Sequence, residues 1–557
     1  MLKKSNRNKY IIGFAFILLL LVGIFVYRDY GVTVDEPIQR IRSLVTYKYI
    51  MSTLFGRDIP ALATYPLTAT YRGQYYGVFL QLPMVLIEDL TGFTMELQSV
   101  WFMRHFITFF YCFLGYLSFY FMSRKIFRND WLALLGTAML LLYPRFFASQ
   151  FFYIKDTLFA ATVMASMWAT VMYLEKGESF GWGVVFCIVT AISTNLRFIG
   201  LIFPALLIGY LFIRDLFVRH VFRQSPRAVW KRIGVYAALG TGFLLTYLAI
   251  SPACWTSIFR SFAHTILQFV CFDGWKGTSV LAGGLVPWDA IPWYYIPLWL
   301  LVSLPIVYLL LFAVSLPLFL MRAIRSGKAA KLTAVSQVEP SGAPAASGVL
   351  GAMLAAPFHY WIFAYMIFFV PLLLVILNHS VIYNDWRQMY FLLVPLILCC
   401  LFALQQLLQT MQKKFIRFAT VALLISCLIF QAGWICVNHP FEIVFFNRAA
   451  AAYGDQFDRD TARSSVYSAL QYLAAHAPED EIILNSSCTD YQNVIKSIAL
   501  LPAEQRKRFG AEESGEYIIE TYRNIIGNAV IHEGYDEWAS FSVDKFHVVT
   551  IFKKSDN

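Results

Sequence analysis

Two adjacent carboxylates, Asp35 and Glu36, stand in the stretch "GVTVDEPIQR" (31–40), directly after the first long apolar run of the chain. A carboxylate held beside a hydroxyl group can act as a general base. Asp35 also has a plain structural alternative, because an Asp that precedes a Pro in the first helical turn is a common helix cap. The pair therefore predicts either a catalytic base or a helix start.

Further ionisable and aromatic residues stand beside or inside apolar runs. The segments are "YPRFFASQFFYIKDTLFA", "ISTNLRFIG", "CFDGWKGTSVLAGG" and "NHSVIYNDWRQMYF", and their candidates are Arg145, Lys155, Asp156, Arg197, Asp273, Trp275, Lys276, His379, Asp385, Trp386 and Arg387. Ionisable groups at membrane depth are costly and mark functional sites by default. Arg and Lys neutralise phosphate, Arg through bidentate contacts. The set suits transfer of a group from an anionic lipid, with one carboxylate as the base.

Each candidate taken alone has a structural alternative. Lys155 and Asp156 could be an interfacial ion pair, Trp275 a residue of the aromatic belt, and His379 an interfacial histidine. Arg197 is harder to explain in this way, because it interrupts an apolar run and needs a buried partner or an anionic ligand. The functional interpretation therefore depends on these residues lying together in space.

The composition is that of an integral membrane protein. Of 557 residues, 59% are hydrophobic and 14% are charged, and the mean hydropathy is +0.59; soluble domains carry about 25% charged residues. The net charge of +11 comes mostly from short loops between apolar runs, which indicates membrane orientation and no nucleic-acid partner. The nine cysteines show no CxxC spacing, so neither a zinc site nor a redox motif is predicted. Cys254 and Cys271 could share one outer loop and pair, but unpaired packing is the preferred interpretation.

At roughly 20 apolar residues per helix, the sequence predicts about eleven transmembrane spans. They lie near 10–27, 103–123, 130–145, 157–174, 181–198, 199–213, 233–253, 296–321, 358–377, 389–408 and 417–437. The first has a basic flank and no small-residue cleavage site, and is interpreted as a retained signal anchor. With this count every basic loop cluster falls on one side, which predicts that this side, with the N-terminus, is cytoplasmic.

Three regions lie outside the spans. The first outer loop, about 28–100, contains "GQYYGVFLQLPMVLIEDLTG" (73–92), which is predicted to be an interfacial amphipathic helix, with a further span as the alternative. Residues 323–356, rich in Ala, Ser, Gly and Pro, predict a flexible cytoplasmic loop. The transmembrane domain is expected to end near 437, and 438–557 reads as a small extracytoplasmic α/β domain of the outer side.

Five ordered motifs resemble the GT-C class of polyprenyl-phosphate-sugar-dependent glycosyltransferases, in particular family 39 with the protein O-mannosyltransferases and the bacterial aminoarabinose transferases. They are the "DE" pair, "PRFFASQFFYIKD" (144–156), "PWYYIP" (292–297), "HSVIYNDWRQMYFLLVP" (379–395) and "HPFEIVFFN" (439–447). The likeness runs from residue 10 to about 460.

This resemblance implies a GT-C-like helical fold with interfacial helices in the first outer loop and an outward-facing active site. Asp35 would be the catalytic base, and Glu36 would orient or assist it. Arg197, Arg387, Lys155 and Arg145 would bind the donor phosphate, and Asp156, His379, Trp275 and Asp385 would bind substrate. The reaction would move one sugar, with inversion, to an envelope glycan, lipid or protein.

The sequence departs from this family in two places. It lacks the Pro-Pro of "KPPLYYWL", which argues against aminoarabinose, and it lacks a β-trefoil insert, which argues against protein acceptors. The rival functions are a transporter or flippase of lipid-linked sugars, which usually shows internal repeats, and a structural subunit. No metal-ligand cluster is evident, so a metal-free, cofactor-free mechanism is preferred and a divalent metal is the open alternative.

Overall fold

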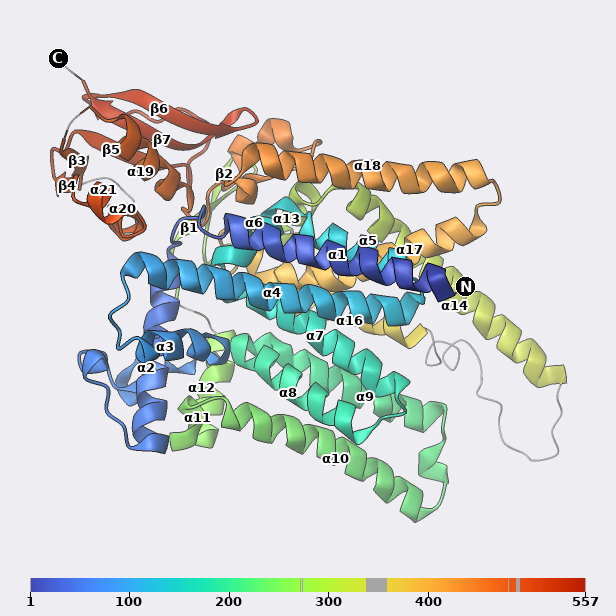
Figure 1. Cartoon of the computed structure of the whole chain (residues 1–557). Coiled ribbons are helices and arrows are strands. Elements are labelled where there is room, and N and C mark those ends of the chain that lie inside the picture. The colour runs from blue at the N-terminus through green and yellow to red at the C-terminus, as the bar shows by residue number, and fades with distance from the viewer. Residues whose placement is uncertain are drawn as a thin grey trace.

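The computed structural model describes residues 2–270, 272, 274–336, 358–478, 480–486 and 491–555. Cys271, Asp273 and most of the predicted loop 323–356 lie outside the described residues. The chain forms a bundle of long helices with a small β-sheet module at one end (Figure 1). The protein is therefore a mainly helical, polytopic chain with a small C-terminal sheet, as predicted.

Nine helices among the described residues are long and apolar enough to cross a membrane. They are α1 (Leu2–Val26), α4 (Leu97–Phe127), α7 (Asp156–Glu175), η5 with α9 (Phe198–Leu201, Ile202–Phe217), α10 (Pro226–Ala249), α14 (Ile306–Ser336), α16 (Phe358–Leu377), η7 with α17 (Arg387–Leu392, Leu393–Thr410) and α18 (Lys414–Asn438). The two remaining predicted spans coincide with a bent pair, α5 (Asp130–Leu141) and α6 (Pro144–Phe152), and with the shorter helix α8 (Phe180–Leu196). The bent pair turns by 70°.

The predicted span 296–321 is divided into two helices. A short helix, α13 (Tyr295–Ser303), ends at Leu304, whose backbone is extended, and α14 begins at Ile306. Pro305 causes the break, because proline has no N–H to donate and disfavours helical geometry in the residue before it.

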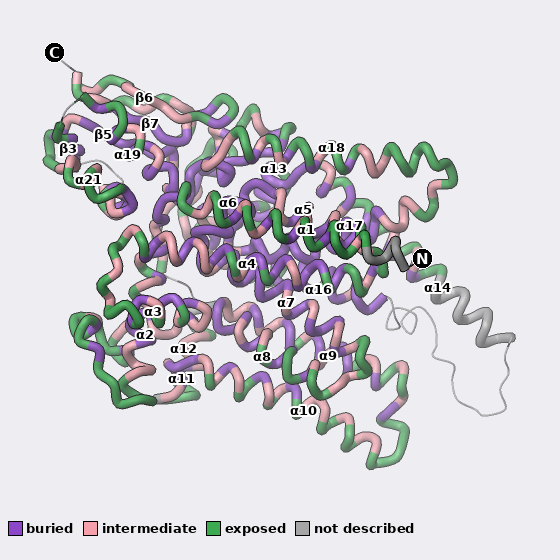
Figure 2. Tube along the Cα trace, in the orientation of Figure 1, coloured by how far each residue is buried: buried purple, intermediate pink, exposed green. Residues whose placement is uncertain are grey.

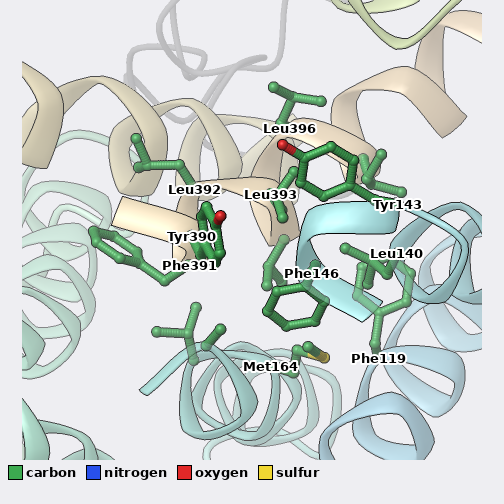
Figure 3. Packing of buried hydrophobic residues seen from close by; sticks show 14 of the residues in the cluster. Phe119, Leu140, Tyr143, Phe146, Met164, Tyr390, Phe391, Leu392, Leu393 and Leu396 are labelled. Atoms are coloured by element: carbon green, nitrogen blue, oxygen red, sulfur yellow. The ribbon is translucent and has the colours of Figure 1, made fainter. Parts of the chain in front are cut away.

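Helices at the centre of the bundle are buried and those at its edge are exposed (Figure 2). In the apolar windows of α7 and α17, 78% of the residues are buried, against 17% in α1 and α10. The exposed residues of the outer helices are apolar, among them Phe14, Phe25 and Ile429, which is expected of surfaces solvated by lipid. Figure 3 shows the core where α17 and η7 pack against α5, α6 and α7, through Tyr390, Phe391 and Phe146.

The first loop contains one helix of 21 residues and several short ones, and none of them is a candidate span. Its elements are α2 (Asp35–Phe55), η1 (Pro60–Leu62), η2 (Thr68–Thr70), η3 (Arg72–Tyr75), η4 (Phe79–Gln81) and α3 (Leu82–Leu90). The ambiguous segment 73–92 thus holds a nine-residue helix, about 13 Å long, which is too short to cross a bilayer. Glu88 and Asp89 of α3 pair with Arg40 and Arg57 respectively, at 2.5 Å and 2.8 Å.

The C-terminal module is a five-stranded sheet packed against helices. Strand order is β4-β3-β5-β7-β6, with β3 parallel to β4 and β5, and β7 antiparallel to β5 and β6. The strands are β3 (Ile482–Asn485), β4 (Phe509–Glu512), β5 (Tyr517–Thr521), β6 (Tyr535–Val543) and β7 (Phe546–Lys554); the helices are α19 (Ser465–His476), α20 (Tyr491–Ile498) and α21 (Ala503–Arg506). The expected helix, strand and closing strand are α19, β3 and β7, and "EYIIETYRN" forms strand β5.

The module is joined to the bundle by close packing. Trp101 of α4 and Val32 of the first loop are buried in the hydrophobic core of the module. A Cβ atom on Gly31 would lie 2.5 Å from the carbonyl oxygen of Ser464, so only glycine allows the loop to approach the module this closely.

The remaining short elements connect the long helices. They are η6 (Val221–Arg223), α11 (Ala253–Thr256), α12 (Ile258–Val270), the hairpin β1 (Thr278–Leu281) and β2 (Gly284–Pro287), η8 (Glu442–Val444) and η9 (Ala451–Gln456). The N-terminus, the turn from α9 to α10 and the turn from α17 to α18 lie at one end of the bundle, and α2, α3 and the sheet module lie at the other (Figure 1). The basic loops therefore share one end, and their assignment to the cytoplasm stays a prediction.

Topology can be tested by labelling single cysteines with a membrane-impermeant maleimide. Thr94, between α3 and α4, and Glu513, in the sheet module, are exposed, as is Gln224 in the turn before α10. We expect Thr94→Cys and Glu513→Cys to label from the same side of the membrane and Gln224→Cys from the other, since 73–92 is too short to span. Cys436, which is exposed, and Cys271 and Cys488, which lie outside the described residues, are replaced by Ser in every variant. Labelling of Thr94 and Glu513 from opposite sides would contradict this arrangement.

Candidate active site

A cavity of about 690 Å³ lies where the first loop, the helix ends and the sheet module meet. It is lined by the first residues of α2 and α7, by 194–199 at the junction of α8 and η5, by the end of α10, and by 379–384 and 387–389 before α17. Thr461, Ala462 and Arg523 of the C-terminal part of the chain complete the wall. The volume is within the range of small-molecule sites.

A chain of alternating charges crosses this cavity. Nη1 of Arg387 lies 2.6 Å from Oδ2 of Asp35 and 3.4 Å from Oδ2 of Asp156. Arg197 donates a hydrogen bond to Oδ1 of Asp156. Four predicted site residues from distant parts of the sequence thus lie in direct contact.

Asp35 and its neighbour Glu36 point in different directions. The side chain of Asp35 is 39% exposed and lines the cavity, whereas that of Glu36 is 3% exposed and does not. Oε2 of Glu36 accepts hydrogen bonds from the backbone N–H and hydroxyl of Thr33, at 2.8 Å and 3.1 Å, and Oε1 lies 2.9 Å from Nε2 of His105. Glu36 therefore anchors the start of α2 and so orients Asp35.

The geometry at the start of α2 is not that expected if Asp35 were only a helix cap. The cap position is Val34, and no side chain accepts a capping hydrogen bond there. The Asp35 carboxylate instead accepts a hydrogen bond from Arg387. The hydrogen bonds that Glu36 accepts from Thr33 take the place of a side-chain cap at this helix start. The Asp35 carboxylate is therefore available at the cavity.

Arg387 is held by a tight turn. Asn384 and Asp385 both have left-handed backbones, with φ of 56° and 64°, a conformation that Asn and Asp tolerate best after glycine. The buried Asp385 carboxylate accepts from the backbone N–H of Arg387, from Nη1 of Arg145 at 3.1 Å and from the hydroxyl of Tyr390 at 3.1 Å. Asp385 and Arg145 therefore position Arg387 from behind.

Arg145 itself lies in the protein core. It is fully buried, and Nε donates to the carbonyl oxygen of Phe445 at 2.7 Å. Neither Arg145 nor Asp385 lines the cavity. They are positioning residues in this structure, whereas the sequence predicted that Arg145 binds phosphate and Asp385 binds substrate; sequence patterns do not distinguish an ion pair inside the core from one at a cavity wall.

Arg197 is placed by a polar residue two positions earlier. Its backbone is extended, between α8 and η5. Asn195 accepts from the backbone N–H of Phe79 at 3.2 Å and donates to the hydroxyl of Ser251 at 3.0 Å, which joins the first loop to the end of α10. A Cβ on Gly77 would lie 1.8 Å from the carbonyl oxygen of Asn195, so glycine is required for this contact.

Three cations at the cavity form no ion pair within 4.0 Å with any described carboxylate, although Asp35 lies within electrostatic range of all three and the buried Asp458 within range of the third. Arg42 and Lys155 both contact the ring of Tyr76, with the guanidinium carbon and Nζ at 3.8 Å and 4.2 Å from its centroid. The third, Arg523, reaches the cavity from the loop between β5 and β6. Cations without counter-ions in a partly buried cavity are suited to an anionic ligand.

Arg42, Tyr76 and Arg523 were not predicted from the sequence. A signal for Arg42 was available, since Asp35, Ile38, Gln39, Arg42 and Thr46 all line the cavity and share one helical face. Arg523 gave no such signal, because its position depends on the fold of the sheet module.

The remaining predicted residues, Trp275 and His379, also line the cavity. Trp275 stacks on Tyr383, with ring centroids 4.2 Å apart, and lines the cavity. His379 is exposed and also lines it. Of the ten predicted site residues, Asp35, Lys155, Asp156, Trp275, Arg197, His379 and Arg387 line the cavity, and Glu36, Arg145 and Asp385 lie behind it.

The charges set the protonation of the two groups that face the cavity most directly. Burial raises the pKa of Asp35, but the nearby charges of Arg387, Arg42 and Arg523 outweigh it and hold the pKa below its usual value. Burial, together with Arg197 and Arg42, holds the pKa of Lys155 well below its usual value. The empty cavity therefore disfavours the charge on Lys155, and an anion would restore it.

Among the described residues, no group of three or more His, Cys, Asp or Glu side chains is placed to hold a metal ion. The residues at the cavity themselves offer a carboxylate for proton transfer and several cations for an anionic leaving group. Such a set fits the transfer of a group from a phosphate ester to a hydroxyl.

No protein-family model matches the sequence, and no curated protein matches it. Among solved structures, the chain is similar to ArnT from Cupriavidus metallidurans in the apo state, with 12% identity, a TM-score of 0.46, and coverage of 97% of this chain and 98% of that chain. The chain is also similar to the same protein bound to undecaprenyl phosphate, with 13% identity, a TM-score of 0.46, and coverage of 98% of this chain and 98% of that chain. An Archaeoglobus fulgidus oligosaccharyltransferase, in complex with Zn and sulfate, matches at 10% identity and a TM-score of 0.39, covering 90% and 67%. At these low values the likenesses carry no argument about the site.

The role of Glu36 can be tested by stability. Glu36→Gln is expected to destabilise the protein by about 1–3 kcal/mol, because buried donors at Thr33 lose an ionised acceptor. Thermal unfolding of the purified chain measures this. Glu504→Gln is the control, since Glu504 is 85% exposed and its loss should change stability by about 0.5 kcal/mol or less. An unchanged stability in Glu36→Gln would show that Glu36 does not anchor α2.

Anion binding is expected to be accompanied by proton uptake. Burial and the charges of Arg197 and Arg42 lower the pKa of Lys155, and a bound anion raises it, so binding increases the protonated fraction of the amine. Calorimetry with a short polyprenyl phosphodiester, whose charge does not titrate near neutral pH, in two buffers of different ionisation enthalpy measures the uptake.

Lys155→Met should remove most of this uptake. Lys545→Met is the matched control, because Lys545 is exposed and does not line the cavity, so its loss leaves Lys155 and its charged neighbours in place. Proton release on binding, or an uptake that survives in Lys155→Met, would contradict the assignment.

Proposed function

We propose that the chain is a membrane glycosyltransferase that moves a single sugar from a polyprenyl-phosphate-linked donor to an acceptor hydroxyl. The observation that carries the proposal is the cavity itself, where a partly exposed carboxylate, Asp35, lies among cations at one end of a bundle of membrane helices. A lipid-linked donor reaches such a site from within the bilayer, so no nucleotide-binding fold is needed.

Asp35 acts as the general base in this reaction. Its Oδ2 accepts the proton of the acceptor hydroxyl while the hydroxyl oxygen forms a bond to the anomeric carbon of the sugar. The bond between that carbon and the phosphate oxygen breaks, and the electron pair leaves on the polyprenyl phosphate. Attack opposite to the leaving group inverts the anomeric centre.

The cations stabilise the leaving phosphate. Arg42 and Lys155, which have no carboxylate partner among the residues described, are the first candidates, and Arg387 and Arg197 lie beside them. Arg387 contacts Asp35 in the empty site, so binding of the phosphate draws its charge away from the base. Asp156 keeps Arg387 and Arg197 in place, and Glu36 keeps Asp35 in place.

The acceptor is an envelope glycan, lipid or protein at the extracytoplasmic face of a bacterial inner or plasma membrane, and the N-terminus is cytoplasmic. The position of the cavity supports this assignment, since it lies at the end of the bundle opposite the basic loops (Figure 1). The same position favours an enzyme over a flippase, whose binding site is expected near the middle of the membrane.

Mass spectrometry of envelope glycans and glycolipids tests the proposal. A deletion strain is expected to lose one sugar unit, and wild-type protein to restore it. Asp35→Asn should restore about 1% or less of that signal, since general-base catalysis contributes about 10²–10⁴-fold.

Asp58→Asn is the matched control, because Asp58 is an exposed acid of the same loop that does not line the cavity. Full restoration by Asp35→Asn would overturn the mechanism. Accumulation of unmodified lipid-linked sugar on the cytoplasmic side of the deletion strain would favour the flippase.

A further inference from the structure

Arg523 extends into the cavity from the sheet module, which otherwise packs against the outer end of the bundle. It lies in the loop after β5, between two anchored residues. The hydroxyl of Tyr522 lies 3.0 Å from that of Thr550, and the backbone N–H of Asn524 donates to Oδ1 of Asp458 at 3.2 Å. The loop thus holds Arg523 at the wall of the cavity.

The guanidinium of Arg523 is not satisfied within the described part of the chain. It forms no hydrogen bond or ion pair with any described residue, and its Nε atom is buried without a partner. Its charge is nevertheless close enough to Asp35 to lower the pKa of that carboxyl. A buried, unpaired N–H beside the proposed base is costly unless a ligand accepts its hydrogen bond.

Charge balance indicates more than one anion. Five basic and three acidic side chains line the cavity: Arg42, Lys155, Arg197, Arg387 and Arg523, with Asp35, Asp156 and Asp289. Arg387 and Arg197 already contact Asp35 and Asp156, and Asp289 is exposed to solvent. A donor phosphodiester carries a single negative charge, and Arg42 and Lys155, which both contact the ring of Tyr76, are enough to bind it.

We propose that Arg523 forms a second anion subsite, which binds a phosphate or carboxylate group carried by the acceptor or by the transferred sugar beside Asp35. The inference rests on the proposed function, because it takes the donor phosphate as the first anion. It gives the sheet module a part in substrate selection, and it makes the complete substrate pair at least doubly anionic.

The test uses the full chain in lipid nanodiscs and two successive titrations. Undecaprenyl phosphate is titrated first. The lipid-saturated protein is then titrated with glycerol 3-phosphate and, separately, with glucuronate, by calorimetry. The second anion is expected to bind to wild type. Arg523→Gln should weaken that step by about tenfold or more and change the affinity for undecaprenyl phosphate by less than about twofold.

Two further variants separate a binding role from a structural one. Arg523→Lys keeps the charge and should recover part of the second binding step. Lys545→Gln removes an exposed cation of the same module that does not line the cavity, and should leave both steps unchanged. Tighter binding of glycerol 3-phosphate supports a subsite whose anion is carried by the acceptor. Tighter binding of glucuronate supports a subsite whose anion is carried by the transferred sugar.

The proposal is overturned if lipid-loaded wild type binds neither anion. It is also overturned if Arg523→Gln weakens undecaprenyl phosphate binding as much as the second step, since Arg523 would then belong to the donor phosphate. Failure of the proposed function gives a different result, because undecaprenyl phosphate itself would not bind in the first titration.

Discussion

The site depends on one buried guanidinium that is shared between two carboxylates. Arg387 is 4% exposed, and a buried charge is stable only when it is paired. Its partners, Asp35 and Asp156, begin α2 and α7, so the first loop and the second half of the bundle must meet at this point. The same contact keeps Asp35 ionised in the empty site and leaves it at the cavity wall.

The positions of the membrane helices could be predicted, because an apolar run of sufficient length has few alternatives to a span. The residues of the site were predicted less well, since a charge in an apolar run can face a cavity or an ion pair in the core. Arg197 and Arg387 face the cavity, whereas Arg145 and Asp385 pair in the core. Glu36 has a side chain one methylene longer than that of Asp35 and the next place in the first helical turn, where it contacts Thr33 and His105. Arg523 depends on long-range packing that no local pattern encodes.

The sheet module is part of the site as well as a covering domain. Its core includes Trp101 of α4, and the close packing at Gly31 joins it to the loop that leads into α2. Movement of the module would therefore displace both Arg523 and the start of the helix that carries Asp35. Such a connection would give the proposed substrate recognition at Arg523 a direct physical route to the proposed base.

The central claim is that the cavity binds a lipid phosphate beside Asp35. An experimental structure of the full chain with undecaprenyl phosphate tests it most directly. The account predicts that the phosphate lies within hydrogen-bond distance of Lys155 and Arg42, and that the guanidinium of Arg387 has turned from Asp35 toward the phosphate. A phosphate bound outside the cavity would contradict it. So would a phosphate that makes no contact with Lys155 and leaves the contact between Arg387 and Asp35 unchanged.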